Sequence, residues 1–152
     1  MLHGSEIIKV SPSFQSGLSR LFFEIKHSDY GQHFHPHPLT AKAALDICQY
    51  EGKDFYCVLV KNDKVIGYGL LRGWDEGYEI PSLGIALSPD VLGSGYGLHL
   101  MKFLHEVAKK RGAGFIRLKV YKDNQRAISL YKKLGYAFQN EQNNQLLGIV
   151  SL

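Results

Sequence analysis

Three glycines occupy alternate positions in the stretch LGSGYGLHLM, where Gly93, Gly95 and Gly97 lie between an apolar run and a segment of helical periodicity. Glycine lacks a Cβ atom, so backbone N–H groups in such a loop can approach a bulky anion closely. The N-terminus of the following helix adds unpaired N–H donors and a partial positive charge. We therefore interpret the stretch as a strand–loop–helix unit that binds a phosphate-bearing ligand. A glycine-rich turn that only starts a helix is the alternative.

The spacing of these glycines differs from two common phosphate loops. In the dinucleotide fingerprint G-x-G-x-x-G that begins at Gly93, the third glycine would stand at Leu98. The Walker pattern ends in Gly-Lys-Ser/Thr, and no such sequence follows this loop. The class of ligand therefore depends on the rest of the chain.

Composition limits the classes of protein that the chain can represent. Its 152 residues suffice for one domain, and 45% hydrophobic with 21% charged residues is ordinary for a globular protein. The formal net charge of +4 favours an acidic ligand, but the Lys and Arg residues are scattered, so we expect no nucleic-acid partner. No signal-peptide core or apolar run of roughly 18 residues is present, and Cys48 and Cys57 lack metal-type spacing. We expect a cytoplasmic monomer or homodimer with free thiols and no membrane association.

Periodicity predicts helices and strands in the order βααβββαβαββ. A hairpin around Asn62 and Asp63 is the clearest local feature, because two apolar runs flank it. The expected strands cover residues 6–11, 55–60, 65–71, 78–89, 115–120, 136–140 and 145–151. The expected helices cover residues 17–28, 98–112 and 124–135, and another begins at Thr40.

This order and the glycine loop together resemble the GNAT N-acetyltransferase superfamily, with the specific likeness running from about Ile80 to Phe138. LGIALSPDVLGSGYGLHLM is similar to the acetyl-CoA segment of that family, whose pattern Arg/Gln-x-x-Gly-x-Gly/Ala falls on residues 92–97. Leu92 replaces the Arg or Gln, which removes a polar side chain and leaves the backbone amides. The resemblance implies an acetyl-CoA site formed by Ala86, Leu87, Leu92, Gly93, Ser94, Gly95, Tyr96 and Gly97.

A second motif supports the resemblance in VYKDNQRAISLYKKLGYAF, which is similar to a family stretch with Asn, Ala, Leu-Tyr and Gly at fixed spacing. Asn124, Ala127, Tyr131 and Gly135 stand at those positions. The first three are implied to contact the cofactor as well. Seven residues along a helix bring Asn124 and Tyr131 onto one face, about 10 Å apart, where one arm of a ligand can touch both.

The resemblance implies one α/β (α+β) domain over residues 1–152, with a mixed, mostly antiparallel central sheet flanked by helices. It also implies transfer of an acetyl group from acetyl-CoA to a primary amine by direct attack on the thioester. A small-molecule acceptor such as an amino sugar or amino acid is favoured, and a metal is not required. A non-catalytic acyl-CoA-binding module and a protein or peptide N-acetyltransferase are the alternatives.

Two residues are candidates for the acid and base of this reaction. Tyr131 is predicted to protonate the leaving thiolate, because a phenol of pKa near 10 can donate to a thiolate whose conjugate acid has a pKa near 8.5. The alternative is a core aromatic residue. Glu79 is the nearest carboxylate on the strand before the loop and is predicted to act as a base through water, with a solvated strand-end residue as the alternative.

The resemblance also implies that the same strand presents a backbone N–H near Leu87 to the oxyanion. Gly84 predicts a bulge in this strand, and Pro81 predicts that strand pairing is interrupted there, since proline cannot donate a ladder hydrogen bond.

The stretch QHFHPHPLT, Gln32–Thr40, has three alternating histidines stiffened by prolines. Alternating histidines suggest a metal, but no carboxylate or cysteine at ligand spacing accompanies them, so we expect no metal site. In the family this loop lines the acceptor pocket, so Phe34, His35 and His37 are predicted to bind the acceptor by stacking and hydrogen bonding.

Overall fold

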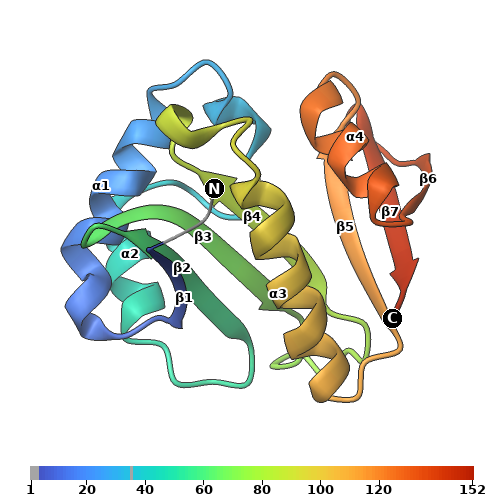
Figure 1. Ribbon diagram of the computed structural model, residues 1–152. Coiled ribbons are helices and arrows are strands. Elements are labelled where there is room, and N and C mark those ends of the chain that lie inside the picture. The colour runs from blue at the N-terminus through green and yellow to red at the C-terminus, as the bar shows by residue number, and fades with distance from the viewer. Residues whose placement is uncertain (1–3, 35) are drawn as a thin grey trace.

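One seven-stranded sheet, in the order β1-β2-β3-β4-β5-β7-β6, forms the centre of the computed structural model (Figure 1). The structure describes residues 4–34 and 36–152. The strands are β1 (Ser5–Lys9), β2 (Phe55–Lys61), β3 (Lys64–Arg72), β4 (Ser82–Leu87), β5 (Phe115–Tyr121), β6 (Ala137–Asn140) and β7 (Gln145–Ser151). The helices are α1 (Gln15–Lys26), α2 (Ala41–Cys48), α3 (Tyr96–Lys110) and α4 (Gln125–Lys133), with short 3₁₀ turns η1 (Pro12–Phe14), η2 (Gly31–His33) and η3 (Pro89–Val91).

Strand pairing is antiparallel throughout the sheet except between β4 and β5, which run parallel. The expected α+β fold, with a mixed and mostly antiparallel sheet and the order βααβββαβαββ, is confirmed. Two tight hairpins follow from local chemistry, because Asn62, Asp63, Asn143 and Asn144 all have positive φ. Asn and Asp tolerate the left-handed region that a two-residue hairpin turn requires.

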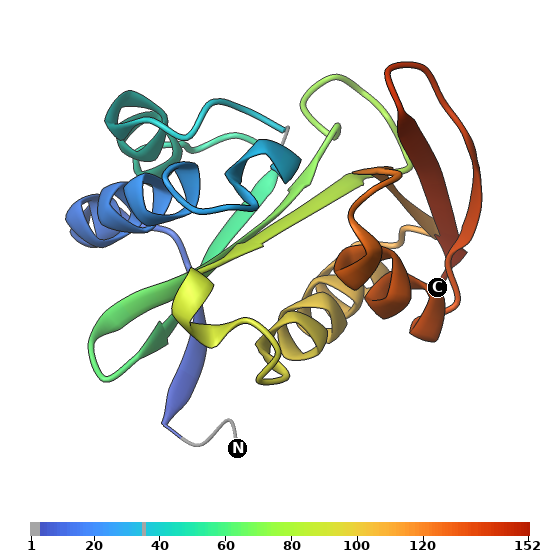
Figure 2. The same ribbon diagram turned by 90° about the horizontal axis from the view of Figure 1, so that it is seen from above.

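Helices cover both faces of the sheet, as Figure 2 shows, with α1 and α2 on one side and α3 and α4 on the other. The α1 side buries a core that includes Leu18, Phe22 and Tyr68. The α3 side buries a second core that includes Leu100 and Leu104. No helix among the described residues has the length and apolar character needed to cross a membrane.

The junction between β4 and β5 is where the sheet opens. Only Ser82 and Arg117 are paired in register, and the Arg117 N–H donates to the Pro81 carbonyl over 3.0 Å. Beyond this pair the two strands diverge (Figure 1). The C-terminal half of β4 therefore has one edge that β5 does not cover.

Two expectations for this strand require correction. The predicted strand over residues 78–89 begins only at Ser82, because residues before it form a turn and a bend and Pro81 has no N–H to donate. The interruption at Pro81 is confirmed. The bulge predicted at Gly84 is wrong, since β3 and β4 pair in unbroken register, and the irregularity of this region lies in β2 between Leu59 and Val60.

Candidate functional site

At two positions of the loop between β4 and α3, the backbone has a positive φ that only glycine adopts easily. Gly93 has φ of 81° and Gly95 has φ of 89°, and Gly95 is the N-cap of α3. A Cβ atom built on Gly95 would meet no heavy atom within 4 Å. The N-terminus of α3 is therefore open at Gly95, which leaves room for an anion beside its backbone N–H groups.

Gly97 is required for a different reason, because it lies inside α3 where other elements pack closely. A Cβ atom on Gly97 would lie 3.2 Å from Cδ2 of Leu130 and 3.6 Å from Cδ1 of Leu87. Gly97 thus brings the end of β4, the start of α3 and the middle of α4 together. Three of the predicted cofactor residues therefore belong to one region of the structure. They are Leu87, Gly97 and Tyr131, the residue after Leu130.

Arg126 is a candidate residue that the sequence prediction missed. Its Nη1 atom would lie 3.3 Å from a Cβ atom on Gly93, so the guanidinium flanks the glycine loop. Arg126 stands in the first turn of α4, where the helix dipole disfavours a cation unless an anion is nearby. The position of an arginine in a first helical turn is the signal in the sequence that could have identified this residue. Arg126 supplies a positive charge near the loop, whereas Leu92, at the position of the Arg or Gln of the family pattern, supplies none.

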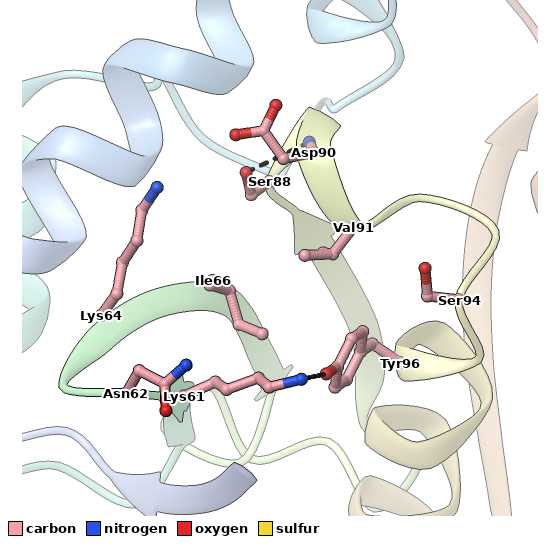
Figure 3. Close-up of a pocket in the computed structure, with 9 residues that line it drawn as sticks. All are labelled: Lys61, Asn62, Lys64, Ile66, Ser88, Asp90, Val91, Ser94 and Tyr96. Carbon is pink, nitrogen blue, oxygen red and sulfur yellow. Dashed lines mark hydrogen bonds between the residues drawn. The ribbon is translucent and has the colours of Figure 1, made fainter. Parts of the chain in front are cut away.

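The side chains of Leu92 and Tyr96 both pack within the protein, Leu92 partly buried and Tyr96 buried. Leu92 packs against the core on the α3 side. Tyr96 is buried, and its hydroxyl accepts a hydrogen bond of 2.8 Å from Lys61 Nζ (Figure 3). Their contact with a cofactor stays a prediction.

A surface hollow of about 510 Å³ lies between the β2–β3 hairpin and the glycine loop (Figure 3). It is lined by Lys61, Asn62, Lys64, Ile66, Ser88, Asp90, Val91, Ser94 and Tyr96. Ser94 faces this hollow, and Ser88 is buried with its Oγ accepting from the Asp90 N–H over 3.3 Å. Lys61 and Lys64 bring positive charge to this hollow, and Asp90 brings a negative charge.

The edge of β4 that β5 does not cover presents the backbone N–H and C=O groups of every second residue. The Ser88 N–H donates to the Ile66 carbonyl over 2.8 Å, so the backbone N–H of Ser88 points toward β3. Because backbone groups of an antiparallel strand point to alternate edges, the N–H groups of Leu87 and Ile85 point to the opposite edge. Leu87 is not free, however. Its N–H donates to the Tyr30 hydroxyl over 3.2 Å, and the same hydroxyl donates to the Leu87 carbonyl. The amide expected to be available near Leu87 is occupied in this structure.

Tyr131 projects from α4 into the core on the α3 side, where burial raises the pKa of its phenol to about 12. Its ring lies 5.7 Å from the ring of Tyr136, measured between centroids, and the Tyr136 hydroxyl is hydrogen-bonded to Nε2 of His105 over 2.8 Å. Among the described residues the hydroxyl of Tyr131 has no hydrogen-bond partner. A protonated, unengaged phenol in an apolar site is suited to donate a proton.

Asn124 and Ala127 form the N-terminal cap of α4. The Asn124 Oδ1 atom accepts a hydrogen bond of 3.3 Å from the Ala127 N–H, so the predicted cofactor residue Asn124 uses its carbonyl to begin the helix. The cap fixes the rotation of α4 and thereby the direction of Tyr131. Their contact with a cofactor stays a prediction.

The sequence analysis placed Glu79 on the strand before the glycine loop, but the structure places it outside β4. It is exposed in the bend that precedes Pro81, at the end of β4 where the strand pairs with β5. The strand begins three residues later at Ser82. No described feature holds the Glu79 carboxylate near the open half of β4, and its role as a base through water stays a prediction.

The histidines of the α1–α2 connection have separate partners. His37 Nε2 lies 3.0 Å from the Tyr68 hydroxyl, its Nδ1 lies 2.7 Å from the Pro38 carbonyl oxygen, and burial lowers its pKa. His33 Nε2 lies 3.3 Å from Asp123 Oδ1. The described residues hold no cluster of potential metal ligands.

The predicted acceptor residues therefore differ in what they can do. Phe34 packs with its ring centroid 5.0 Å from that of His37 and 6.3 Å from that of Tyr68. Because both nitrogens of His37 have partners, His37 positions Phe34 and the connection more readily than it binds an acceptor. His35 lies outside the described residues.

Comparison with known proteins gives a consistent result for sequence and fold. The model of the acetyltransferase (GNAT) family matches residues 20–136. A thialysine N-epsilon-acetyltransferase of Bos taurus is 39% identical over 75 residues, which cover 47% of this chain and 44% of that protein. The match therefore spans less than half the length of this relative.

Solved structures resemble the whole fold at low sequence identity. A PaiA N-acetyltransferase of Thermoplasma acidophilum in complex with coenzyme A has a TM-score of 0.81 at 18% identity, covering 97% of this chain and 99% of that one. A GCN5-related N-acetyltransferase of Kribbella flavida has a TM-score of 0.82 at 18% identity, covering 100% of both chains. These likenesses show the fold.

Proposed function

The chain belongs to the acetyltransferase (GNAT) family, and we propose on this basis that it transfers an acetyl group from acetyl-CoA to a primary amine of a small molecule. The observation that carries the proposal is the uncovered edge of β4 leading into the glycine loop. A ligand whose phosphates bind the amides at Gly93 and Gly95 can extend an arm along this edge. Coenzyme A combines a pyrophosphate with such an arm.

The reaction places its atoms as follows. The amine nitrogen attacks the thioester carbonyl carbon, the C–S bond breaks, the amine loses a proton, and the departing thiolate gains one. Leu87 and Ile85 direct their N–H groups to the edge along which the arm lies, so the thioester oxygen can take one of these donors as it gains negative charge.

Tyr131 is the proposed acid that protonates the departing thiolate. Burial affects the proton affinities of both the phenol oxygen and the thiolate sulfur. With a pKa near 12, Tyr131 keeps its proton at neutral pH. A thiolate in water binds a proton far more weakly than a phenolate does. Desolvation raises the proton affinity of a thiolate that departs into an apolar site beside Tyr131, which favours transfer of the phenol proton.

An acceptor of the amino-acid or amino-sugar type is the finer part of the proposal. The relative of Bos taurus is named for thialysine, whose acetylated group is an amine of an amino acid. The connection proposed to face the acceptor offers Phe34 and imidazoles and has only Asp29 as an acidic residue between α1 and α2. This charge pattern does not suit a polycationic acceptor.

A thiol-release assay tests the proposal, with acetyl-CoA as donor and a panel of amino sugars, amino acids, polyamines and peptides as acceptors. We expect turnover with at least one amino acid or amino sugar and weaker turnover with polyamines. Preference for a peptide would replace the proposal with a peptide N-acetyltransferase. Acetyl-CoA binding without turnover of any acceptor would support a binding module.

A further inference from the structure

Tyr30 lies in the connection after α1 and reaches the uncovered edge of β4. Its hydroxyl accepts from the Leu87 N–H over 3.2 Å and donates to the Leu87 carbonyl. Burial raises the pKa of Tyr30 to about 12, so the hydroxyl keeps the proton that it donates. One side chain therefore satisfies both backbone groups of Leu87, which would otherwise face the opening between β4 and β5.

This arrangement imitates strand pairing. A residue on a sheet edge offers one N–H and one C=O, and a neighbouring strand satisfies both with the amide groups that it carries. The pantetheine arm of coenzyme A contains secondary amides, which also supply a donor and an acceptor. A thioester carbonyl only accepts, so it would leave the Leu87 carbonyl without a partner.

We propose that Tyr30 is a positioning residue that occupies the place of the pantetheine arm at Leu87 and is displaced when coenzyme A or acetyl-CoA binds. This inference rests on the proposed function, because it takes coenzyme A as the ligand of the glycine loop. With a pantetheine amide at Leu87, the next N–H along the same edge, that of Ile85, is available to the thioester oxygen.

The same connection also touches the other side of the opening. His33, three residues after Tyr30, has its Nε2 atom 3.3 Å from Asp123 Oδ1, and Asp123 precedes the N-cap of α4. The segment 28–34 thus contacts β4 through Tyr30 and the β5–α4 loop through His33. Displacement of Tyr30 would shift Phe34, which is proposed to face the acceptor and which His37 positions, and would couple cofactor binding to the acceptor site.

The test compares Tyr30→Phe with the wild-type protein by calorimetry, using coenzyme A, acetyl-CoA and adenosine 3′,5′-bisphosphate. Phenylalanine keeps the ring but cannot hold Leu87, so it removes both hydrogen bonds that the pantetheine arm must replace. We expect affinity for coenzyme A and acetyl-CoA to rise about 5- to 100-fold, the equivalent of two ordinary hydrogen bonds. Affinity for adenosine 3′,5′-bisphosphate, which has no pantetheine, should stay within about twofold.

Tyr50→Phe is the matched control, because the Tyr50 hydroxyl bonds with Asp75 and the Asp54 N–H, away from the edge of β4. It should leave all three affinities unchanged. Hydrogen exchange of the wild-type segment 28–34 should accelerate with coenzyme A and not with adenosine 3′,5′-bisphosphate. Unchanged or weaker coenzyme A binding by a folded Tyr30→Phe variant would overturn the role of Tyr30. Failure of the wild-type protein to bind coenzyme A at all would instead overturn the proposed function.

Discussion

Tyr131 shows how burial can determine the chemistry of a single side chain. The residue is 8% exposed, and the absence of water raises the pKa of its phenol to about 12. The same burial would make Tyr131 an ordinary core residue if no thiolate left beside it. A substitution that keeps the ring and removes the hydroxyl separates these roles.

Replacement of Tyr131 by Phe should lower kcat about 10- to 1,000-fold, since a positioned acid contributes about 10²- to 10⁴-fold and water can partly replace it. Acetyl-CoA affinity and the melting temperature should change little, because the Tyr131 hydroxyl has no hydrogen-bond partner among the described residues. Steady-state kinetics under conditions where chemistry limits turnover give the measurement. A kcat within about twofold of wild type would mean that Tyr131 only packs.

Arg126 provides a second prediction for a single residue. Arg126→Gln should weaken coenzyme A binding about 3- to 30-fold, because a cation near the phosphates contributes a charge-assisted hydrogen bond. Lys133→Gln removes one charge from the last turn of the same helix and serves as the control. Calorimetry at two salt concentrations should show a weaker salt dependence for Arg126→Gln only. Equal losses in both variants would indicate a general effect of net charge.

At the scale of elements, the glycine loop combines two constraints that look identical in the sequence. Gly95 needs its positive φ and borders open space, whereas Gly97 needs its missing side chain so that α3 can approach Leu130 and Leu87. Gly95 is therefore proposed to serve ligand binding, whereas Gly97 serves the packing of α3. Substitutions at the two positions should have different consequences.

Gly95→Val should abolish or strongly weaken acetyl-CoA binding, because a branched side chain would block the N–H groups of α3 and strain a φ of 89°. We expect its stability to fall by about 1–2 kcal/mol, the cost of a strained φ. Gly97→Val should be the less stable protein, since its side chain would have to displace Leu130, at about 1–3 kcal/mol for overpacking, which the slightly higher helix propensity of valine offsets only in part. Urea unfolding and calorimetry on both variants test this contrast. Unchanged affinity in a folded Gly95→Val protein would contradict the cofactor assignment at this loop.

At the scale of the whole molecule, the two cores on either side of the sheet bury several groups that ionise only at high pH. Burial raises the pKa values of Cys57 and Tyr131 to about 12. In the unfolded chain these groups lose their protons near pH 8.5 and 10 respectively. The folded protein keeps them protonated over that interval, so the unfolded state binds fewer protons and folding becomes less favourable as pH rises.

The free energy of unfolding should therefore begin to fall above about pH 8.5 and fall more steeply above about pH 10. Each group contributes up to about 1.4 kcal/mol per pH unit between its two pKa values. Urea unfolding at pH 8, 9, 10 and 11 measures the slope, and Tyr131→Phe should reduce it above pH 10. A midpoint that is constant up to pH 11 would show that the buried groups are not protonated as described.

The sequence by itself determined the elements and their order, because periodicity, Asn and Asp turns and the cap at Asn124 act over a few residues. It also identified the glycine loop, whose positive φ values are local properties. Tertiary structure decided which β4 groups are accessible, since the contact between Tyr30 and Leu87 joins residues 57 positions apart. It likewise placed Arg126 beside Gly93 and left Glu79 outside the strand. Such contacts depend on how strands diverge and helices pack, which no local pattern of residues specifies.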